Sequence, residues 1–121
     1  MTLTPESKKA LLLAAIDEKK ATDVKVLSLE GKTLIADWFI VCTGNSRIHI
    51  RAIADGALEK MKEAGIKGIR CEGYEQGTWV LIDFDEVVVH IFDQEERERY
   101  SIEDLWEKMR QVEQPVEPVE V

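Results

Sequence analysis

Apolar residues along the chain change their spacing several times, and these changes predict helices that alternate with strands. Thr4-Pro5-Glu6 has the capping hydroxyl, the first-turn proline and the acid that begin a helix, which we expect to end near Lys20. Gly44-Asn45-Ser46 precedes a second helix, and Gly65 is its predicted left-handed cap. The core-facing positions of this second helix follow helical spacing at Ile50, Ile53, Ala54, Ala57, Leu58 and Met61.

Three runs outside these helices are typical of strands. Val24–Leu29 has apolar residues on both faces, and Asp37–Thr43 contains five consecutive apolar residues. We therefore expect Asp37–Thr43 to be a central strand that is covered on both faces. Gly68–Glu72 is a short strand after the second helix, and the order strand, helix, strand implies a right-handed parallel crossover.

The segment from Trp79 to Phe92 holds two β-rich apolar runs around a short acidic step, Asp83–Glu86, and predicts a hairpin. Ser101–Asp104 resembles a capping box that begins a last helix. We expect Leu105 and Trp106 to be core-facing residues of that helix. The fold class is therefore α/β, a sandwich in which helices pack on a mixed sheet of about five strands.

Composition limits the organisation and the partners. The 121 residues predict one domain, 1–110, followed by a disordered acidic tail of Pro, Val and Glu, 111–121. The net charge of −8 and the absence of a basic stripe argue against direct nucleic-acid binding as the main activity and favour a basic protein partner. No apolar run has the roughly 20 residues that span a bilayer, and no signal peptide is evident, so we expect a cytoplasmic protein.

The two cysteines, Cys42 and Cys71, are interpreted as small buried apolar residues in a reducing compartment. Neither lies at a spacing that is typical of zinc ligands. The sequence therefore predicts no metal, no cofactor and no disulfide.

Three groups of polar residues invite a chemical role. Thr43–Ser46 follows a strand and precedes a helix, where an anion could bind, but a single glycine favours a simple turn and helix cap. His90 lies between apolar residues of a strand and is interpreted as a hydrogen-bonded sheet residue rather than a base. Arg97, Tyr100 and Glu103 are interpreted as a clasp that fixes the last helix.

Trp79 is the strongest candidate for a binding residue. Alternation along its strand places Trp79, Leu81 and Asp83 on one face. Val80 and Ile82 point to the other face, so Trp79 stays partly exposed if the helices pack there; the alternative is that Trp79 simply covers the sheet. A partly exposed tryptophan beside carboxylates has the make-up of a binding hot spot. The predicted partner-binding residues are Trp79, Leu81, Asp83, Phe84 and Asp85.

An ordered set of short segments resembles one known family. The segments are Asp37–Ser46, Ala52–Asp55, Glu72-Gly73, Trp79–Asp83, Val88–Phe92 and Arg97–Tyr100 with Leu105-Trp106 after it. No single segment is specific, but the ordered set resembles the bacterial ribosomal silencing factors, also called the Iojap family. The resemblance runs from about Leu11 to Trp106, which is nearly all of the chain except its tail.

This resemblance implies a binding protein. It implies that the chain binds ribosomal protein number fourteen of the standard series, on the intersubunit face of the large ribosomal subunit. The bulk of the domain then blocks joining of the small subunit and represses translation when nutrients are scarce. The acidic charge fits a basic ribosomal protein and is repelled by the surrounding rRNA. Because free members of the family commonly form homodimers, we expect a homodimer here.

Two other functions stay open. The chain could be an assembly or maturation factor for the large subunit that acts through the same contact. It could also be an enzyme, because the family is similar in fold to nucleotidyltransferases, whose active members hold two metal ions on an Asp-x-Asp pair. Asp83-Phe84-Asp85 has that spacing, but it falls at a turn, and Val87–Val89 occupy the place of the further acid that is required. The sequence therefore predicts no catalytic residues.

Overall fold

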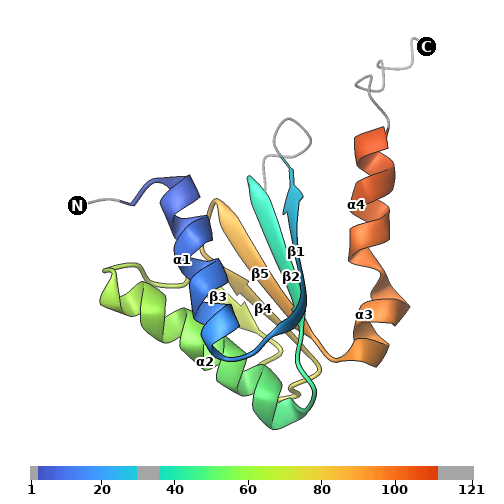
Figure 1. Ribbon diagram of the computed structural model, residues 1–121, viewed down its shortest axis with the longest axis horizontal. Helices are drawn as coiled ribbons and strands as arrows, with labels where there is room; N and C mark the ends of the chain where they lie inside the picture. The colour runs from blue at the N-terminus through green and yellow to red at the C-terminus, as the bar shows by residue number, and fades with distance from the viewer. Residues whose placement is uncertain (1–2, 30–35, 112–121) are drawn as a thin grey trace.

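Five strands form one mixed sheet in the order β1-β2-β5-β4-β3 (Figure 1). The structure is a computed structural model that describes residues 3–29 and 36–111, without the side chains of residue 106 and residues 108–111. The strands are β1 Thr22–Ser28, β2 Trp38–Thr43, β3 Arg70–Glu72, β4 Trp79–Asp83 and β5 Val87–Phe92. β2 and β5 pair in parallel, and the other neighbours pair antiparallel. The predicted mixed sheet of five strands and the predicted hairpin between β4 and β5 are therefore confirmed.

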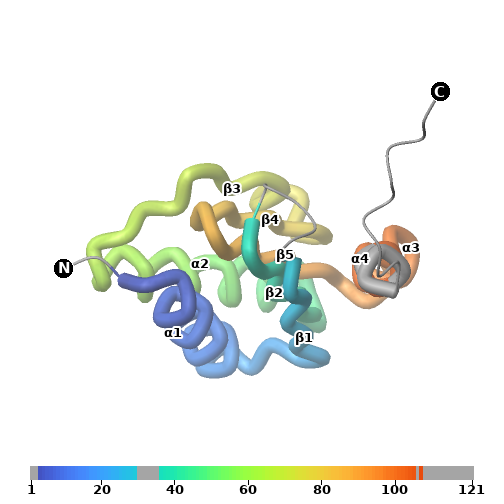
Figure 2. The backbone as a smooth tube through the Cα atoms, turned by 90° about the horizontal axis from the view of Figure 1, so that it is seen from above, coloured from blue at the N-terminus to red at the C-terminus, as the bar shows by residue number. Residues whose placement is uncertain are grey.

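The described residues form four helices, α1 Pro5–Glu18, α2 Arg47–Glu63, α3 Gln94–Tyr100 and α4 Ile102–Gln111. The Thr4 side chain caps α1 by accepting a hydrogen bond from the Ser7 amide, as predicted. α1 and α2 lie on one side of the sheet, and α3 and α4 lie on the other (Figure 2). No described helix is both long and apolar enough to cross a membrane.

The main core lies between the sheet and the helices α1 and α2. α2 contributes its predicted apolar stripe, in which Leu58 is half-buried and the other members are fully buried. β2 and β5 are buried along their whole length, because they are the inner strands of the sheet and are covered on both faces. The prediction of a central strand at Asp37–Thr43 is confirmed.

The opposite face of the sheet forms a second, smaller core. Its buried members come from β1, β2 and β5 and the loop residues beside them, and they are Leu27, Leu29, Ala36, Phe39, Val41, Val88 and Phe92. Trp79 and Leu81 of β4 and Ile102 of α4 pack against this cluster but stay partly exposed. The second face is therefore closed near β2 and open along β4.

The short α3 and the start of α4 correct the prediction for the C-terminal part. Asp93 caps α3 by accepting a hydrogen bond from the Glu96 amide, and Ser101 ends this helix in the left-handed conformation with φ 46°. Ser101 donates its hydroxyl hydrogen to the Glu98 carbonyl, so it closes α3 and does not form a capping box. Leu105 is 57% exposed rather than core-facing, because α4 extends away from the sheet (Figure 1).

The predictions for the crossover and for the two cysteines are confirmed only in part. β2 and β3 flank α2 and run in the same direction, as a crossover requires, but β5 and β4 lie between them in the sheet. Cys42 is buried, whereas Cys71 is exposed, because β3 is a short edge strand with no helix over it. Residues 112–121 of the predicted tail lie outside the described residues.

Candidate partner-binding surface

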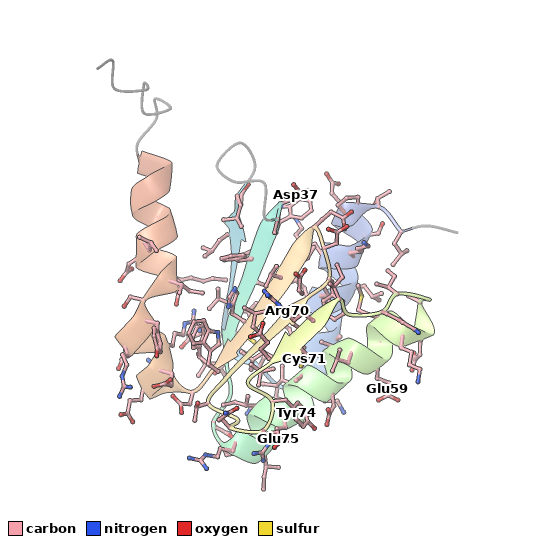
Figure 3. All side chains as sticks on the ribbon, turned by 180° about the vertical axis from the view of Figure 1, so that it is seen from behind. Asp37, Glu59, Arg70, Cys71, Tyr74 and Glu75 are labelled. Carbon is pink, nitrogen blue, oxygen red and sulfur yellow. The ribbon has the colours of Figure 1, made fainter. Side chains whose placement is uncertain are left out.

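The open part of the second face is built on β4. Trp79, Leu81 and Asp83 are half-buried and alternate with buried residues that face α2, as predicted from the strand period. Pairing with β3 places Glu72 opposite Leu81 and Arg70 opposite Asp83 on the same face (Figure 3). These five residues are named the β4 surface. A shallow hollow of about 230 Å³ lies on it, lined by Glu72, Gly73, Trp79 and Leu81.

Trp79 is fixed in place by three neighbours. Its ring stacks on Phe92 with centroids 4.8 Å apart and lies 4.7 Å from the ring centroid of Tyr100. Its indole Nε1 donates a hydrogen bond of 3.2 Å to Nδ1 of His90 on β5. Trp79 therefore offers a rigid, partly exposed apolar ring, and its single polar atom is already bonded.

His90 is buried beneath this tryptophan. The indole N–H can only donate, so Nδ1 of His90 accepts and its Nε2 carries the hydrogen. Nε2 has no hydrogen-bond partner among the described residues, and the imidazole lies edge-on to the Phe39 ring at 4.5 Å. Burial lowers the pKa of His90 to about 4. The histidine is thus neutral near pH 7 and serves to position Trp79, which agrees with its interpretation as a hydrogen-bonded sheet residue.

The loop between β3 and β4 also fixes the start of β4. Gly73 has φ +80°, and a Cβ there would lie 2.0 Å from the Trp79 carbonyl oxygen, so no side chain fits. Arg51 of α2 donates from Nε to the Tyr74 carbonyl at 3.0 Å and from Nη2 to the Glu75 carbonyl at 2.5 Å. Tyr74 and Glu75 lie over the first half of α2 (Figure 3), so the loop is tied to that helix.

Negative charge lies at the far end of β4. Asp83 accepts a hydrogen bond of 2.8 Å from the Asp85 amide, which closes a tight turn with Asp85 at φ 77°. Glu86 pairs with Lys8 at 2.7 Å, and this hydrogen bond lowers the pKa of the Glu86 carboxyl. Asp85 is exposed and has no ion pair among the described residues, so Asp83 and Asp85 carry the available charge of this turn.

This turn also bears on the enzyme hypothesis. The two aspartates are joined by a turn hydrogen bond and do not stand side by side on a strand. In the part of the chain that the structure describes, no group of three or more His, Cys, Asp or Glu residues could hold a metal ion.

Phe84 does not belong to the predicted surface. Its side chain is 1% exposed and lies in the core beneath the helices, with Val80 and Ile82. The strand alternation continues through this position, so Phe84 points away from Asp83 and Asp85. A partner cannot contact Phe84 unless part of the core opens, and the candidate surface loses this residue.

The predicted clasp at the entry to α4 is present and reaches further than expected. The Arg97 guanidinium donates to Glu103 at 2.5 and 3.0 Å and to the Thr43 hydroxyl of β2 at 2.7 Å. The bond from Arg97 lowers the pKa of the Glu103 carboxyl. Tyr100 is 49% exposed and extends the aromatic surface beside Trp79, a role that the sequence reasoning missed.

Ser46 caps α2 by accepting a hydrogen bond of 3.0 Å from the His49 amide. A Cβ on Gly44 would lie 2.6 Å from the Ile50 side chain, so this glycine allows α2 to approach the turn. The turn-and-cap interpretation of Thr43–Ser46 is therefore confirmed.

The fold and this surface together define a class: a small α/β protein whose candidate site is an open, aromatic and acidic sheet face. The sequence model of the family described as "ribosomal silencing factor during starvation" matches residues 2–120. The chain belongs to this family of ribosomal silencing factors.

Relatives and solved structures agree with this assignment. The chain is 48% identical over 96 residues to a ribosomal silencing factor of Halalkalibacterium halodurans, covering 79% of this chain and 82% of that protein. It is 43% identical over 93 residues to the ribosomal silencing factor of Bacillus subtilis, covering 77% and 79%. A crystal structure of a Chromobacterium violaceum protein has a TM-score of 0.84 at 35% identity, covering 86% of this chain and 87% of that chain.

One more distant relative has a different name. The chain is 25% identical over 99 residues to the mouse protein named "mitochondrial assembly of ribosomal large subunit protein 1", covering 79% of this chain and 43% of that protein.

Proposed function

We propose that this protein silences ribosomes by binding ribosomal protein number fourteen on the large subunit and blocking the small subunit from joining. The contact consists of Trp79, Leu81, Asp83 and Asp85, with Tyr100 beside Trp79. Membership of the silencing-factor family supports the class of function. The mechanism is steric and involves no catalysis, and the place of action is the cytoplasm.

The fixed, half-buried ring of Trp79, which lines a hollow on the same strand face as Asp83, is the observation that carries the proposal. Rigid aromatic side chains in partly desolvated pockets supply much of the binding energy of protein interfaces. The hollow lined by Trp79 and Leu81 fits an aliphatic side chain, and its lip carries Glu72. Such a surface fits a basic protein whose side chains have long apolar stems.

The size of the domain supports a steric block. An ordinary interface buries about 800 Å² on each partner, whereas the accessible surface of this chain is 7840 Å². About a tenth of the surface is then used for binding. The remainder projects from the large subunit into the space where the small subunit docks.

We further propose that the free protein is a homodimer that covers its open sheet face with a second copy. The half-buried apolar residues of β4 and the exposed ring of Tyr100 support this proposal, because large apolar patches are uncommon on free monomers. Sedimentation velocity at several concentrations measures this state. A monomer at every concentration would contradict the homodimer and leave ribosome binding untouched.

Co-sedimentation with separated ribosomal subunits tests the proposed contact. We expect the wild type to sediment with the large subunit and not with the small one. Trp79→Ala and Asp83→Lys should abolish this binding while unfolding remains cooperative, because neither side chain lies in the main core. Glu59→Lys on the exposed side of α2 is the matched charge control and should bind normally. Normal co-sedimentation of both β4 variants would exclude this surface.

Assembly of the large subunit is the second candidate function, and the name of the mouse relative favours it. The two functions differ in their effect on mature subunits. A silencing factor lowers the yield of joined ribosomes when it is added to purified subunits, whereas an assembly factor leaves this yield unchanged. Magnesium-dependent nucleotide binding in calorimetry would instead support an enzyme.

A further inference from the structure

About half of the cations in the described part of this acidic chain pair with a carboxylate. Among the described residues, carboxylates pair with Lys8, Lys25, Lys60, Arg70, Arg97 and Arg99. Lys9 lies over the Trp38 ring at 4.5 Å. The other described cations have no carboxylate partner, and they are gathered at a few places.

The unpaired cations of the described part lie at the two ends of α2. Lys62 and Lys67 lie near its C-terminal end, where cations suit the helix dipole. Arg47 lies at the opposite end, where the dipole of α2 is positive and offers it no such compensation, and Lys19 and Lys20 lie beside it at the C-terminal end of α1. The first turn of α2 contains no acidic residue. Arg51 adds a fourth charge there, because its guanidinium donates to backbone carbonyls and not to a carboxylate.

Contacts between helices and loops bring these cations together. His49 Nε2 lies 2.7 Å from the Lys19 carbonyl oxygen, which joins the end of α1 to α2 (Figure 1). Arg47 and Arg51 both reach Gly77 of the loop before β4, where a Cβ would lie 3.1 Å from the Arg47 side chain and 3.3 Å from Arg51 Nη2. We name Lys19, Lys20, Arg47 and Arg51 the basic corner.

Acids at the basic corner leave it positive. Glu18 pairs with Lys60, and Asp55 accepts a hydrogen bond from the Tyr74 hydroxyl. Asp17 and Glu75 lie at its border, and Asp55 keeps its negative charge because its donor is a neutral hydroxyl, so the four cations exceed these three acids by one.

Charge is therefore divided along β4. The basic corner adjoins the loop that leads into Trp79, and the free carboxylates of Asp83 and Asp85 lie at the other end of the strand. The two ends are about 13 Å apart, from the rise of an extended strand. Trp79 faces the side of the sheet away from α1 and α2, so the basic corner lies around the edge of the sheet from the Trp79 ring (Figure 2).

We propose that the basic corner contacts the phosphate backbone of ribosomal RNA next to the protein contact on the large subunit. This inference rests on the proposed function and names a second partner for the same binding event. A basic protein faces the acidic end of β4, and a polyanion faces the basic end. Arg51 is held rigidly by two carbonyls, and Arg47 is exposed beside it, so the pair is preorganised for phosphate oxygens.

Phosphate contacts of this kind set orientation and carry no sequence information. They agree with the lack of a basic stripe in the sequence, because four cations supply only a small part of the affinity of a dedicated RNA-binding protein. The corner would fix the rotation of the domain about Trp79, and so determine where its bulk projects.

The salt dependence of binding to purified large subunits tests this inference. We expect Lys20→Gln with Arg47→Gln in the full chain to bind about tenfold more weakly at low salt. The slope of log K against log salt should fall by about one for each phosphate contact that is lost. Lys62→Gln with Lys67→Gln is the matched control at the other end of α2, and its affinity and slope should equal those of the wild type.

Binding to isolated ribosomal protein number fourteen separates this inference from the proposed function. We expect the Lys20 and Arg47 variant to bind that protein as the wild type does. If this variant has the affinity and slope of the wild type on large subunits, the inference alone is overturned. It is also overturned if the variant loses as much affinity for the isolated protein as it loses for large subunits. A wild type that binds subunits but not the isolated protein would overturn the proposed partner. The salt slopes of the wild type and the variant on large subunits would still show whether the basic corner contacts phosphate. A wild type that binds no subunits would overturn both.

Discussion

The polar atom of Trp79 is hydrogen-bonded within its own chain, and its ring packs against two aromatic rings of the same chain. The indole N–H is bonded to His90, and the ring is held between Phe92 and Tyr100. A side chain that is ordered before binding loses little rotamer freedom when a partner arrives. In the proposed contact, the role of His90 is to orient the Trp79 ring without touching the partner.

The buried imidazole makes the stability of the protein depend on pH. Burial lowers the pKa of His90 from 6.5 to about 4, so below pH 6.5 the unfolded chain binds a proton that the folded chain does not bind. The contribution of the neutral His90 to the free energy of unfolding is complete above pH 6.5. About 3 kcal/mol is lost as the pH falls toward 4. Urea unfolding at several pH values measures this loss.

His90→Asn keeps an acceptor near the position of Nδ1 and cannot titrate, so its stability should change little between pH 6.5 and 4.5. The pKa values of Glu86 and Glu103 are held below their ordinary value of 4.5 by Lys8 and Arg97. Their contribution is present above pH 4.5 and is lost below it, outside this window. A variant that keeps the wild-type pH dependence above pH 4.5 would contradict the assignment to His90.

Alternation along one strand predicts the part of the site that lies on β4, and the error at Phe84 arose because the alternation was not followed to that residue. Trp79, Leu81 and Asp83 share a face as expected. The same alternation, carried one residue further, places Phe84 in the core, but the acidic neighbours of Phe84 suggested the surface instead. Tyr100 was outside the reach of strand patterns, because its neighbour in space is a residue of another element.

At the scale of elements, the pair α3 and α4 is held to the sheet by a few polar contacts. Arg97 is buried and joins Glu103 of α4 to Thr43 of β2. Ile102 of α4 packs with the second core, and Tyr100 of α3 packs against Trp79 beside it. The clasp therefore contributes a large share of the attachment, unlike an ion pair on an exposed helix.

Removal of the Arg97 charge tests this attachment. Arg97→Met should lower the free energy of unfolding by about 2 kcal/mol, because it leaves Glu103 and Thr43 without their partner. Arg99→Met on the same helix is the matched control. It should change the free energy of unfolding by less than about 0.5 kcal/mol, since the ion pairs of Arg99 with Glu95 and Glu96 lie at the surface.

Amide hydrogen exchange locates the effect of the same substitution. Exchange should increase in 94–105 and remain slow in β2 and β5. Equal stabilities of the two variants, or faster exchange spread over the whole sheet, would show that the clasp does not hold these helices.

The helix α3 was missed because its seven residues are almost all charged and have no apolar period. Asp93 three residues before Glu96 is a capping signal that could have located its start, since that side chain accepts the Glu96 amide hydrogen. Ser101 lies at two boundaries, because it ends α3 and directly precedes α4. The predicted helix start is therefore correct, and only the capping box is wrong, since the Ser101 hydroxyl donates to the Glu98 carbonyl.

At the scale of the whole molecule, the sequence indicates the number of strands but not their order. The parallel pair of β2 and β5 joins segments that are far apart in the chain, with α2 and two other strands between them. Local patterns carry no information on such a pairing. In the same way, the net charge of −8 gives no sign that folding gathers four cations near the loop before β4.

A protein that acts by its bulk must act stoichiometrically, and this gives a prediction for the whole molecule. The fraction of large subunits that fail to join small subunits should equal the fraction occupied by this protein, at every ratio tested. Sucrose-gradient profiles of purified subunits, titrated with the protein and probed for its presence in each fraction, measure both quantities. Loss of joining at amounts far below one protein per large subunit would contradict the steric mechanism and would support a catalytic one.

If a partner binds at Trp79 as proposed, the hydrogen bond between Trp79 and His90 determines which substitutions in that partner are tolerated. Because its only N–H already donates to His90, the indole can contact a partner only through its apolar surface. It cannot form a hydrogen bond with a hydroxyl or amide across the interface. Exchanges among aliphatic residues of similar volume in the partner should therefore preserve the complex. A polar residue of equal size at that place would be desolvated without compensation, and the complex would dissociate faster.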